Sequence, residues 1–169
     1  TAEAVKASGT VSETGMTYMR EGIHTLSDEG LKNAKRICEE YKSSLPEKYF
    51  GTLKKDLYEK HEIISRIYGV DGIAMDKLEI SEGEFDCEKF KSGDYIVVSA
   101  FADDGSGRYY DIGDSVIIDF GNGKKKEYHV MAIGDVAYPL SPQFSSMLDV
   151  YFTMYSDEFI KETGDKNAL

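Results

Sequence analysis

Residues 115–136, SVIIDFGNGKKKEYHVMAIGDV, decide the fold class of this chain. In the first part of the stretch, Val116, Ile118 and Phe120 recur at every second position, which is the period of a strand with one buried face. The triplet Gly-Asn-Gly at 121–123 consists of residues that tolerate the positive φ angles of a tight hairpin turn. The remainder returns as a second apolar-rich strand. The stretch therefore predicts a β-hairpin over residues 115–136.

The hairpin lies within a β-rich portion that we expect to span residues 94–169. This portion begins with DYIVVSAF, residues 94–101, a nearly continuous apolar run that is typical of a strand buried on both faces. The pattern of LDVYFTMY, residues 148–155, predicts a last strand, and a terminal helix is expected over 156–163.

Residues 1–93 are expected to form a helix-rich portion with some strands. A helix is predicted to begin at Ser27. A serine at the start of a helix accepts hydrogen bonds from its first backbone N–H groups, and the two acidic residues that follow Ser27 suit the positive end of the helix dipole. The apolar stripe of this helix consists of Leu31, Ala34, Ile37, Cys38 and Tyr41. A second helix is predicted over 46–60, with Phe50, Leu53 and Leu57 inward. Strands are predicted in 16–26 and 62–70.

The end of this portion carries two short elements. Residues 71–80 predict a helical turn, and Asp86 is placed to cap a single further turn that Gly93 closes. Taken together, the patterns predict one α+β domain over residues 1–169, with an N-terminal helical part and a mostly antiparallel β subdomain.

The charge of the chain restricts its partners. Its net charge is −11, with 31 acidic against 20 basic residues, whereas binding to nucleic acid requires clustered Lys and Arg. The densest basic run, Lys124–Lys126, adjoins the hairpin turn and is interpreted as a solvated tip. We therefore expect no nucleic acid partner. No run approaches the ~20 apolar residues that span a bilayer, and a start at Thr1 without methionine favours an excised piece of a longer protein.

Ser115 lies in a Gly-Asp-Ser triplet, a setting in which some hydrolases carry a nucleophile. A serine nucleophile needs a base, and the chain has three histidines, His24, His61 and His129. His129 is on the return strand of the hairpin, so cross-strand pairing can bring it near Ser115. The triplet opens a strand, however, and lacks the strand-to-helix elbow that exposes a nucleophile. We therefore interpret Ser115 as the first residue of a strand, predict no catalytic residue, and keep a hydrolase only as the least favoured alternative.

Metal and cofactor sites are not indicated by the sequence. Cys38 and Cys87 are 49 positions apart, a spacing that matches no zinc motif, and a disulfide between them is left open. The acidic residues Asp103, Asp104 and Asp111 do not satisfy the register of an EF-hand calcium loop. We predict no cofactor and no metal ligand.

Aromatic residues in predicted loops are the candidates for contact with a partner protein. They are Tyr109, Tyr110, Tyr138 and Phe144. Packing in the core is the alternative for each of them.

Four segments resemble the extracytoplasmic domains of FtsX/MacB-type ABC transporter permeases. The run LEISEGEFDCEKFKSGDYIVVS, residues 78–99, matches a glycine-containing phrase that precedes a buried strand in that family. Residues 109–136 resemble its hairpin, residues 150–164 its strand followed by a short helix, and residues 64–78 the segment before the glycine phrase. Residues 1–63 match only in outline.

The resemblance implies a MacB-like periplasmic core domain, inserted between transmembrane helices on the extracytoplasmic side of the cell membrane. It implies no catalytic residue, because a separate cytoplasmic ATPase subunit hydrolyses ATP in this family. The expected partners are the transmembrane helices of the same permease, the ATPase subunit indirectly, and a second permease copy. Such a domain relays conformational change, or contacts substrate or an accessory protein, in export or peptide resistance. A soluble adaptor module that binds a ligand or a protein is the alternative.

Overall fold

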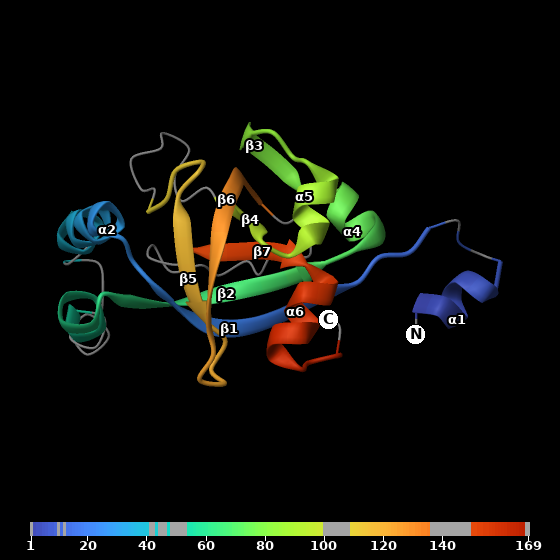
Figure 1. The fold of residues 1–169 in the computed structure, drawn as a ribbon, viewed down its shortest axis with the longest axis horizontal. Coiled ribbons are helices and arrows are strands. Elements are labelled where there is room, and N and C mark those ends of the chain that lie inside the picture. The colour runs from blue at the N-terminus through green and yellow to red at the C-terminus, as the bar shows by residue number, and fades with distance from the viewer. Residues whose placement is uncertain are drawn as a thin grey trace.

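The computed structural model of the protein describes residues 2–9, 11, 13–40, 43, 47, 54–99, 109–135 and 150–167. Its elements, in chain order, are α1 (Ala2–Ala7), β1 (Thr17–Thr25), α2 (Asp28–Glu40), η2 (Asp56–Lys60), β2 (Glu62–Val70), α4 (Gly72–Asp76), β3 (Glu79–Gly83), α5 (Cys87–Ser92), β4 (Tyr95–Val98), β5 (Ser115–Asp119), β6 (Lys125–Asp135), β7 (Tyr151–Tyr155) and α6 (Ser156–Thr163) (Figure 1). The predicted α+β class is confirmed.

The strands form a closed, mixed barrel. Pairing runs from β6 through β4, β7, β2 and β1 to β5, and β5 pairs back with β6, so that six strands close on themselves. The seventh strand, β3, pairs with the C-terminal part of β6, beyond the part that pairs with β5. Most of these pairings are antiparallel, but β2–β7 and β4–β6 are parallel. Closure gives the six strands neighbours on both sides, which removes the exposed edges that make open sheets prone to aggregation.

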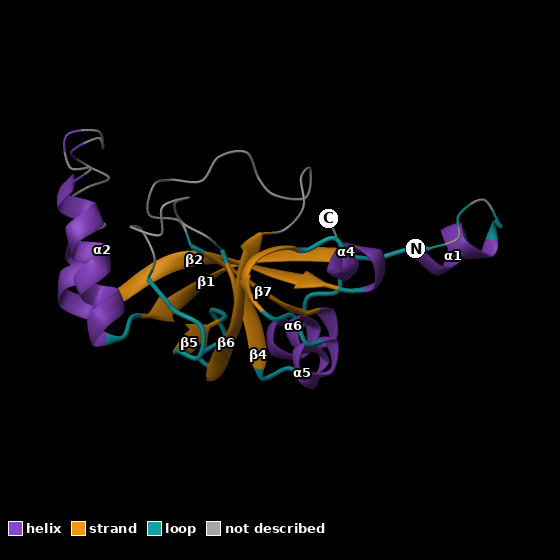
Figure 2. Cartoon of the chain, turned by 90° about the horizontal axis from the view of Figure 1, so that it is seen from above, coloured by secondary structure: helices purple, strands orange, loops and turns teal. Residues whose placement is uncertain are grey.

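The helices lie around this barrel rather than in a layer of their own. In two perpendicular views, α2 lies at one end of the barrel, α5 and α6 lie together towards the opposite end, and α1 lies apart from it (Figures 1 and 2). Two strands of the N-terminal portion, β1 and β2, are neighbours in the same barrel as the strands of the β-rich portion. The two portions of the sequence therefore share one sheet.

The predicted hairpin is confirmed in register and orientation. Ser115 pairs with His129 and Asp119 with Lys125. Val116, Ile118 and Phe120 are each fully buried, as the alternation indicated. Gly121 and Gly123 have φ angles of 80° and 77°, which is the left-handed geometry that the Gly-Asn-Gly turn was expected to supply.

The helix boundaries follow from side-chain capping. Ser27 Oγ accepts from the backbone N–H of Gly30 at 3.1 Å at the start of α2. At the start of α5, Asp86 Oδ1 accepts from the N–H groups of Glu88 and Lys89 at 3.0 and 3.1 Å, and Gly93 ends the helix with φ 83°. Both caps were predicted from the sequence.

Replacing Asp86 by alanine should lower the free energy of unfolding by about 1 kcal/mol, because two N–H groups of α5 lose their acceptor. Chemical denaturation followed by circular dichroism measures this change. Asp86→Asn is the matched control, since an asparagine oxygen caps nearly as well. Equal losses of unfolding free energy in the two variants would show that the charge of Asp86, rather than its capping oxygen, stabilises α5.

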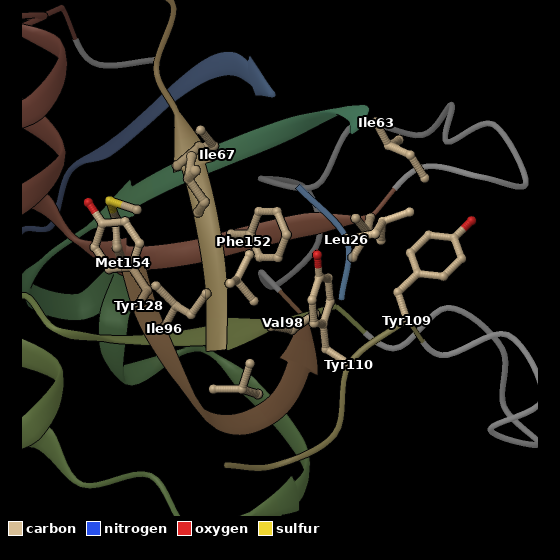
Figure 3. Packing of buried hydrophobic residues seen from close by; sticks show 14 of the residues in the cluster. Leu26, Ile63, Ile67, Ile96, Val98, Tyr109, Tyr110, Tyr128, Phe152 and Met154 are labelled. Atoms are coloured by element: carbon tan, nitrogen blue, oxygen red, sulfur yellow. The ribbon is translucent and has the colours of Figure 1, made fainter. Parts of the chain in front are cut away.

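The core fills the interior of the barrel. Its labelled members in Figure 3 are Leu26, Ile63, Ile67, Ile96, Val98, Tyr109, Tyr110, Tyr128, Phe152 and Met154. They come from strands at both ends of the sequence and from the segment before β5, so that packing joins the N-terminal strands to the hairpin. A smaller cluster under α4 and α5 contains Phe90, Met75 and Val97.

The structure contains two elements that are not among the predicted ones, α1 and β3. The helix α1 lies before the first predicted strand, and its AEAVKA sequence is rich in good helix formers. Within the predicted helix 46–60, the structure describes a π-helical turn, η2, with Leu57 fully buried as predicted, whereas Phe50 and Leu53 lie outside the described residues. The strand β3 was not predicted, because four of its five residues are exposed and no apolar alternation marks it.

Candidate functional site

A cleft of about 350 Å³ lies on the outer side of β4 and β6. Its lining includes the apolar side chains of Met131 and Ile112 and the ring of Tyr95. Glu84 and Lys89 add charges of both signs to this lining. The volume lies within the range of clefts that bind small molecules. A bulge in β6 helps to form it, since the β4–β6 register shifts between Ile96 and Val97. The cleft therefore combines apolar and charged side chains in its lining.

A row of four side chains runs beside the cleft across β5, β6, β4 and α5. Ser115 Oγ lies 3.2 Å from His129 Nδ1, and both residues are exposed. The His129 and Tyr95 rings are 5.8 Å apart, and Lys89 Nζ lies 5.8 Å from the centre of the Tyr95 ring. The predicted approach of His129 to Ser115 by cross-strand pairing is confirmed.

The surroundings of Ser115 do not favour nucleophilic catalysis. Within the described residues, no carboxylate contacts His129 to orient its ring, whereas a serine nucleophile relies on such a group. The backbone N–H groups nearby are already engaged. Gly113 donates to Val130 at 2.8 Å, and Val130 donates to Asp114 at 2.9 Å, so neither is directed at a developing oxyanion. Gly113 has φ 93°, a left-handed conformation that suits glycine in the turn before β5.

The aromatic residues proposed for partner contact are not an exposed set. Tyr109 is 4% exposed and Tyr110 is 2% exposed, so both belong to the core rather than to a contact surface. Burial raises the pKa of the Tyr110 phenol, whose O–H donates to the backbone oxygen of Thr25 at 3.3 Å. Tyr138 and Phe144 lie outside the described residues. The sequence did not distinguish the two alternatives because aromatic residues serve in cores as well as in interfaces.

A buried charge cluster lies where the hairpin meets α6. Glu158, 5% exposed, accepts from Lys126 Nζ at 2.5 Å, from Lys161 Nζ at 2.9 Å and from the Tyr128 hydroxyl at 3.2 Å. Lys126 also donates to the backbone oxygen of Gly93 at 2.9 Å, at the end of α5. Burial and the nearby Glu158 carboxylate raise the pKa of Tyr128. We call these residues the Glu158 cluster.

Sequence reasoning missed the Glu158 cluster, although one signal pointed to it. Lys126 was interpreted as part of a solvated hairpin tip, but it shares its face of β6 with the fully buried Tyr128, two positions further on. An ammonium on a buried face needs an anion. The parity of the strand therefore indicated a partner for Lys126, while nothing local indicated that α6 supplies it.

A second polar contact ties the first strand to the last helix. Asp71 Oδ1 accepts from the backbone N–H of Met16 at 2.7 Å, and its Oδ2 accepts from the Ser156 hydroxyl at 2.9 Å. Further along, Arg20 Nη1 donates to the backbone oxygen of Thr163 at 3.3 Å. The start of β1 and the whole of α6 therefore lie side by side.

Cysteine and metal chemistry can be assessed for the described residues. Cys38 is buried and Cys87 partly buried, and no disulfide joins them. Within the described ranges, no group of three or more His, Cys, Asp or Glu side chains is arranged to hold a metal ion. Asp103 and Asp104 of the acidic loop lie outside those ranges.

Comparisons of the chain with models of protein families, with curated proteins and with solved structures give no match. Among the described residues, no helix has the length and apolarity that crossing a membrane requires.

Proposed function

We propose that this protein is a non-catalytic extracytoplasmic domain of an FtsX/MacB-type ABC transporter permease, with a MacB-like periplasmic core fold. In this role the barrel transmits conformational change between the permease and a substrate or accessory protein during export or peptide resistance. Its partners are the transmembrane helices of the same permease, a cytoplasmic ATPase subunit indirectly, and a second permease copy. The sequence resemblance over residues 64–164 is the starting point.

The observation that carries the proposal is the contact between β1 and α6. The Tyr18 and Phe159 rings stack with centroids 5.7 Å apart, and Arg20 donates to the oxygen of Thr163. A domain whose first strand and last helix are adjacent can be inserted between two consecutive helices of a host without distorting either. Asp71 adds hydrogen bonds to Met16, directly before β1, and to Ser156, the first residue of α6. Motion of a host helix joined to either element would therefore reach the other directly.

The positions of the resembling segments give further support. Gly93 comes from the glycine phrase, Lys126 from the hairpin and Glu158 from the strand–helix segment, and all three meet in the Glu158 cluster. Segments that lie far apart in the sequence thus form one continuous unit. This is expected if the resemblance reflects a shared structure rather than separate chance matches.

Side-specific labelling in intact cells tests the proposal. In the full-length gene product carrying Cys87→Ser, a cysteine introduced by Lys124→Cys at the exposed hairpin turn should react with a membrane-impermeant maleimide added outside. The native Cys38 is the internal control, because it is fully buried and should react only after denaturation.

Two results would contradict the proposal. Labelling at position 124 only after cell lysis would place the domain in the cytoplasm. A full-length gene product without hydrophobic spans on both sides of the domain would contradict the assignment to a permease.

A further result is expected if the proposal holds: purification of the labelled protein should also recover an ATPase subunit.

The cleft beside Tyr95 favours a second candidate, a soluble adaptor module that binds a small ligand or a protein segment. Its mixed lining, with Met131 and Ile112 beside Glu84 and Lys89, is suited to an amphipathic ligand. Recovery of a partner without any transporter component would favour this alternative over the permease.

A further inference from the structure

His24 occupies the middle of the pairing that closes the barrel. The β1–β5 seam consists of three residue pairs, in which His24 is opposite Ile118, with Ile23–Asp119 and Thr25–Ile117 on either side. The neighbouring β1–β2 pairing has nine pairs, and β5–β6 has five. The closure therefore depends on a short ladder with an imidazole at its centre.

The imidazole is completely buried in surroundings that suit only its neutral form. Its Nδ1 contacts Ser65 Oγ from β2, and its ring meets those of Phe152 and Tyr110 with centroids 5.1 and 5.6 Å apart. Figure 3 shows Phe152 and Tyr110 in the interior of the barrel. Within the described residues, His24 Nε2 has no hydrogen-bond partner. An N–H⁺ at this atom would be buried without an acceptor, which is strongly unfavourable.

The charged groups around His24 do not offset this cost. Tyr110 is the titratable side chain whose ring contacts it, and burial keeps that phenol protonated. Side chains alternate between the two faces of a strand, and Ser65 and Ile118 are on the buried face. The neighbouring charged residues therefore lie on the outer face: Glu62 and Arg66 on β2, and Asp119 on β5. On β6, Lys126 pairs with Ile118, but its ammonium donates a hydrogen bond to Glu158. Burial alone accounts for the lowered pKa of His24, which is about 3.

We propose that His24 is an acid-sensitive latch, whose protonation opens the barrel locally at the β1–β5 seam. The proton can be accommodated only if the ring reaches water. Separation of the three seam pairs provides this access while the longer β1–β2 ladder stays intact. Opening would bring the interior rings of Tyr110 and Phe152 to the surface under mild acid. This property is independent of the transporter role.

The direction of the pH effect follows from proton linkage. The open state binds a proton with the ordinary imidazole pKa of 6.5, and the closed state only near 3. The closed seam is therefore fully favoured above pH 6.5 and loses stability as the pH falls towards 3. Between pH 7 and pH 5 the equilibrium constant for opening should rise roughly 25-fold.

Hydrogen exchange followed by mass spectrometry tests the latch. The background carries His61→Asn and His129→Asn, so that His24 is the sole histidine; His61 has φ 59°, which asparagine tolerates well. Exchange rates are divided by the intrinsic rate at each pH. Peptides that cover residues 22–26 and 115–120 should lose protection roughly 25-fold between pH 7 and pH 5, whereas peptides from β4 and β7 should not.

Substitution of His24 separates the latch from ordinary acid unfolding. His24→Asn keeps a donor for Ser65, and His24→Phe keeps a ring between Tyr110 and Phe152 and serves if the first variant does not fold. Either variant should abolish the seam-specific pH effect. The latch is overturned if all barrel peptides lose protection together, if the seam is unaffected at pH 5, or if the effect persists without His24.

Discussion

Phe159→Ala should lower the free energy of unfolding by about 3–5 kcal/mol, because it removes a fully buried ring that fixes α6 on the barrel. The ring stacks on Tyr18 and lies over Gly69, where a β-carbon would come within 2.6 Å of Phe159 Cβ. Gly69 thus leaves the space that Phe159 fills. Urea denaturation of the 169-residue chain, monitored by circular dichroism, measures the loss.

The glycine supplies a complementary variant and the matched control. Gly69→Ala should destabilise the protein by about 1–3 kcal/mol through overpacking against Phe159. Phe159→Ala keeps Cβ but removes the ring atoms Cγ and Cδ1, which would lie 2.7 and 3.3 Å from the added methyl group, so the combined loss in the double variant should be smaller than the sum. Ile160→Ala, at a partly buried neighbour, controls for the alanine substitution itself. Strictly additive losses would contradict the packing described for this pair.

Local signals in the sequence predicted the elements whose determinants are adjacent in the chain. The hairpin was predicted because alternation and the Gly-Asn-Gly turn lie within 22 residues, and the α5 cap because Asp86 and Gly93 flank one turn. The contact between Ser115 and His129 followed from the hairpin register. Each of these depends on hydrogen bonds over a short separation in sequence.

Barrel closure was not predictable in the same way. The parallel β2–β7 pairing joins Arg66 to Tyr151, and nothing in either strand specifies the other as its neighbour. The residues of β3 are mostly exposed, so its own sequence does not mark it as a strand. Its contacts with β6 define it, among them the hydrogen bond that the Ser81 hydroxyl donates to the backbone oxygen of Ile133. The candidate cleft depends on these non-local pairings, so its residues could not be grouped from the sequence.

The contacts of buried polar residues could not be predicted from the sequence either. His24 lies at the same parity in β1 as the buried Tyr18, but the imperfect alternation of residues 16–26 did not predict that it is buried. Periodicity cannot show, however, that Ser65 meets one ring nitrogen and that the other has no partner among the described residues. The same holds for Glu158, whose position in a short helix resembles that of an exposed acidic residue until tertiary contacts are known.

The Glu158 cluster gives the second large expected effect. Glu158→Gln should lower the free energy of unfolding by about 2–3 kcal/mol, because Lys126 loses a charged acceptor in a largely buried site. Glu29→Gln is the matched control: its carboxylate is 70% exposed and pairs with Lys32 at 3.4 Å, so its loss should stay below about 0.5 kcal/mol. Comparable losses of unfolding free energy in the two variants would show that Glu158 does not form a stabilising buried ion pair between the hairpin and α6.

A double-mutant cycle separates the Glu158–Lys126 pair from its surroundings. Lys126→Met keeps an unbranched side chain but removes the ammonium, whose nitrogen lies 4.9 Å from the centre of the Tyr128 ring, and leaves Glu158 with Lys161 and the Tyr128 hydroxyl. Because each single variant leaves one charge without its main partner, whereas the double variant leaves neither, the double loss should be smaller than the sum by at least about 1 kcal/mol. The coupling should also persist in high salt, since a buried pair is screened much less than the exposed Glu29–Lys32 pair. A coupling that disappears in salt would mean that water reaches the cluster and that packing of Phe159, rather than charge, holds α6 in place.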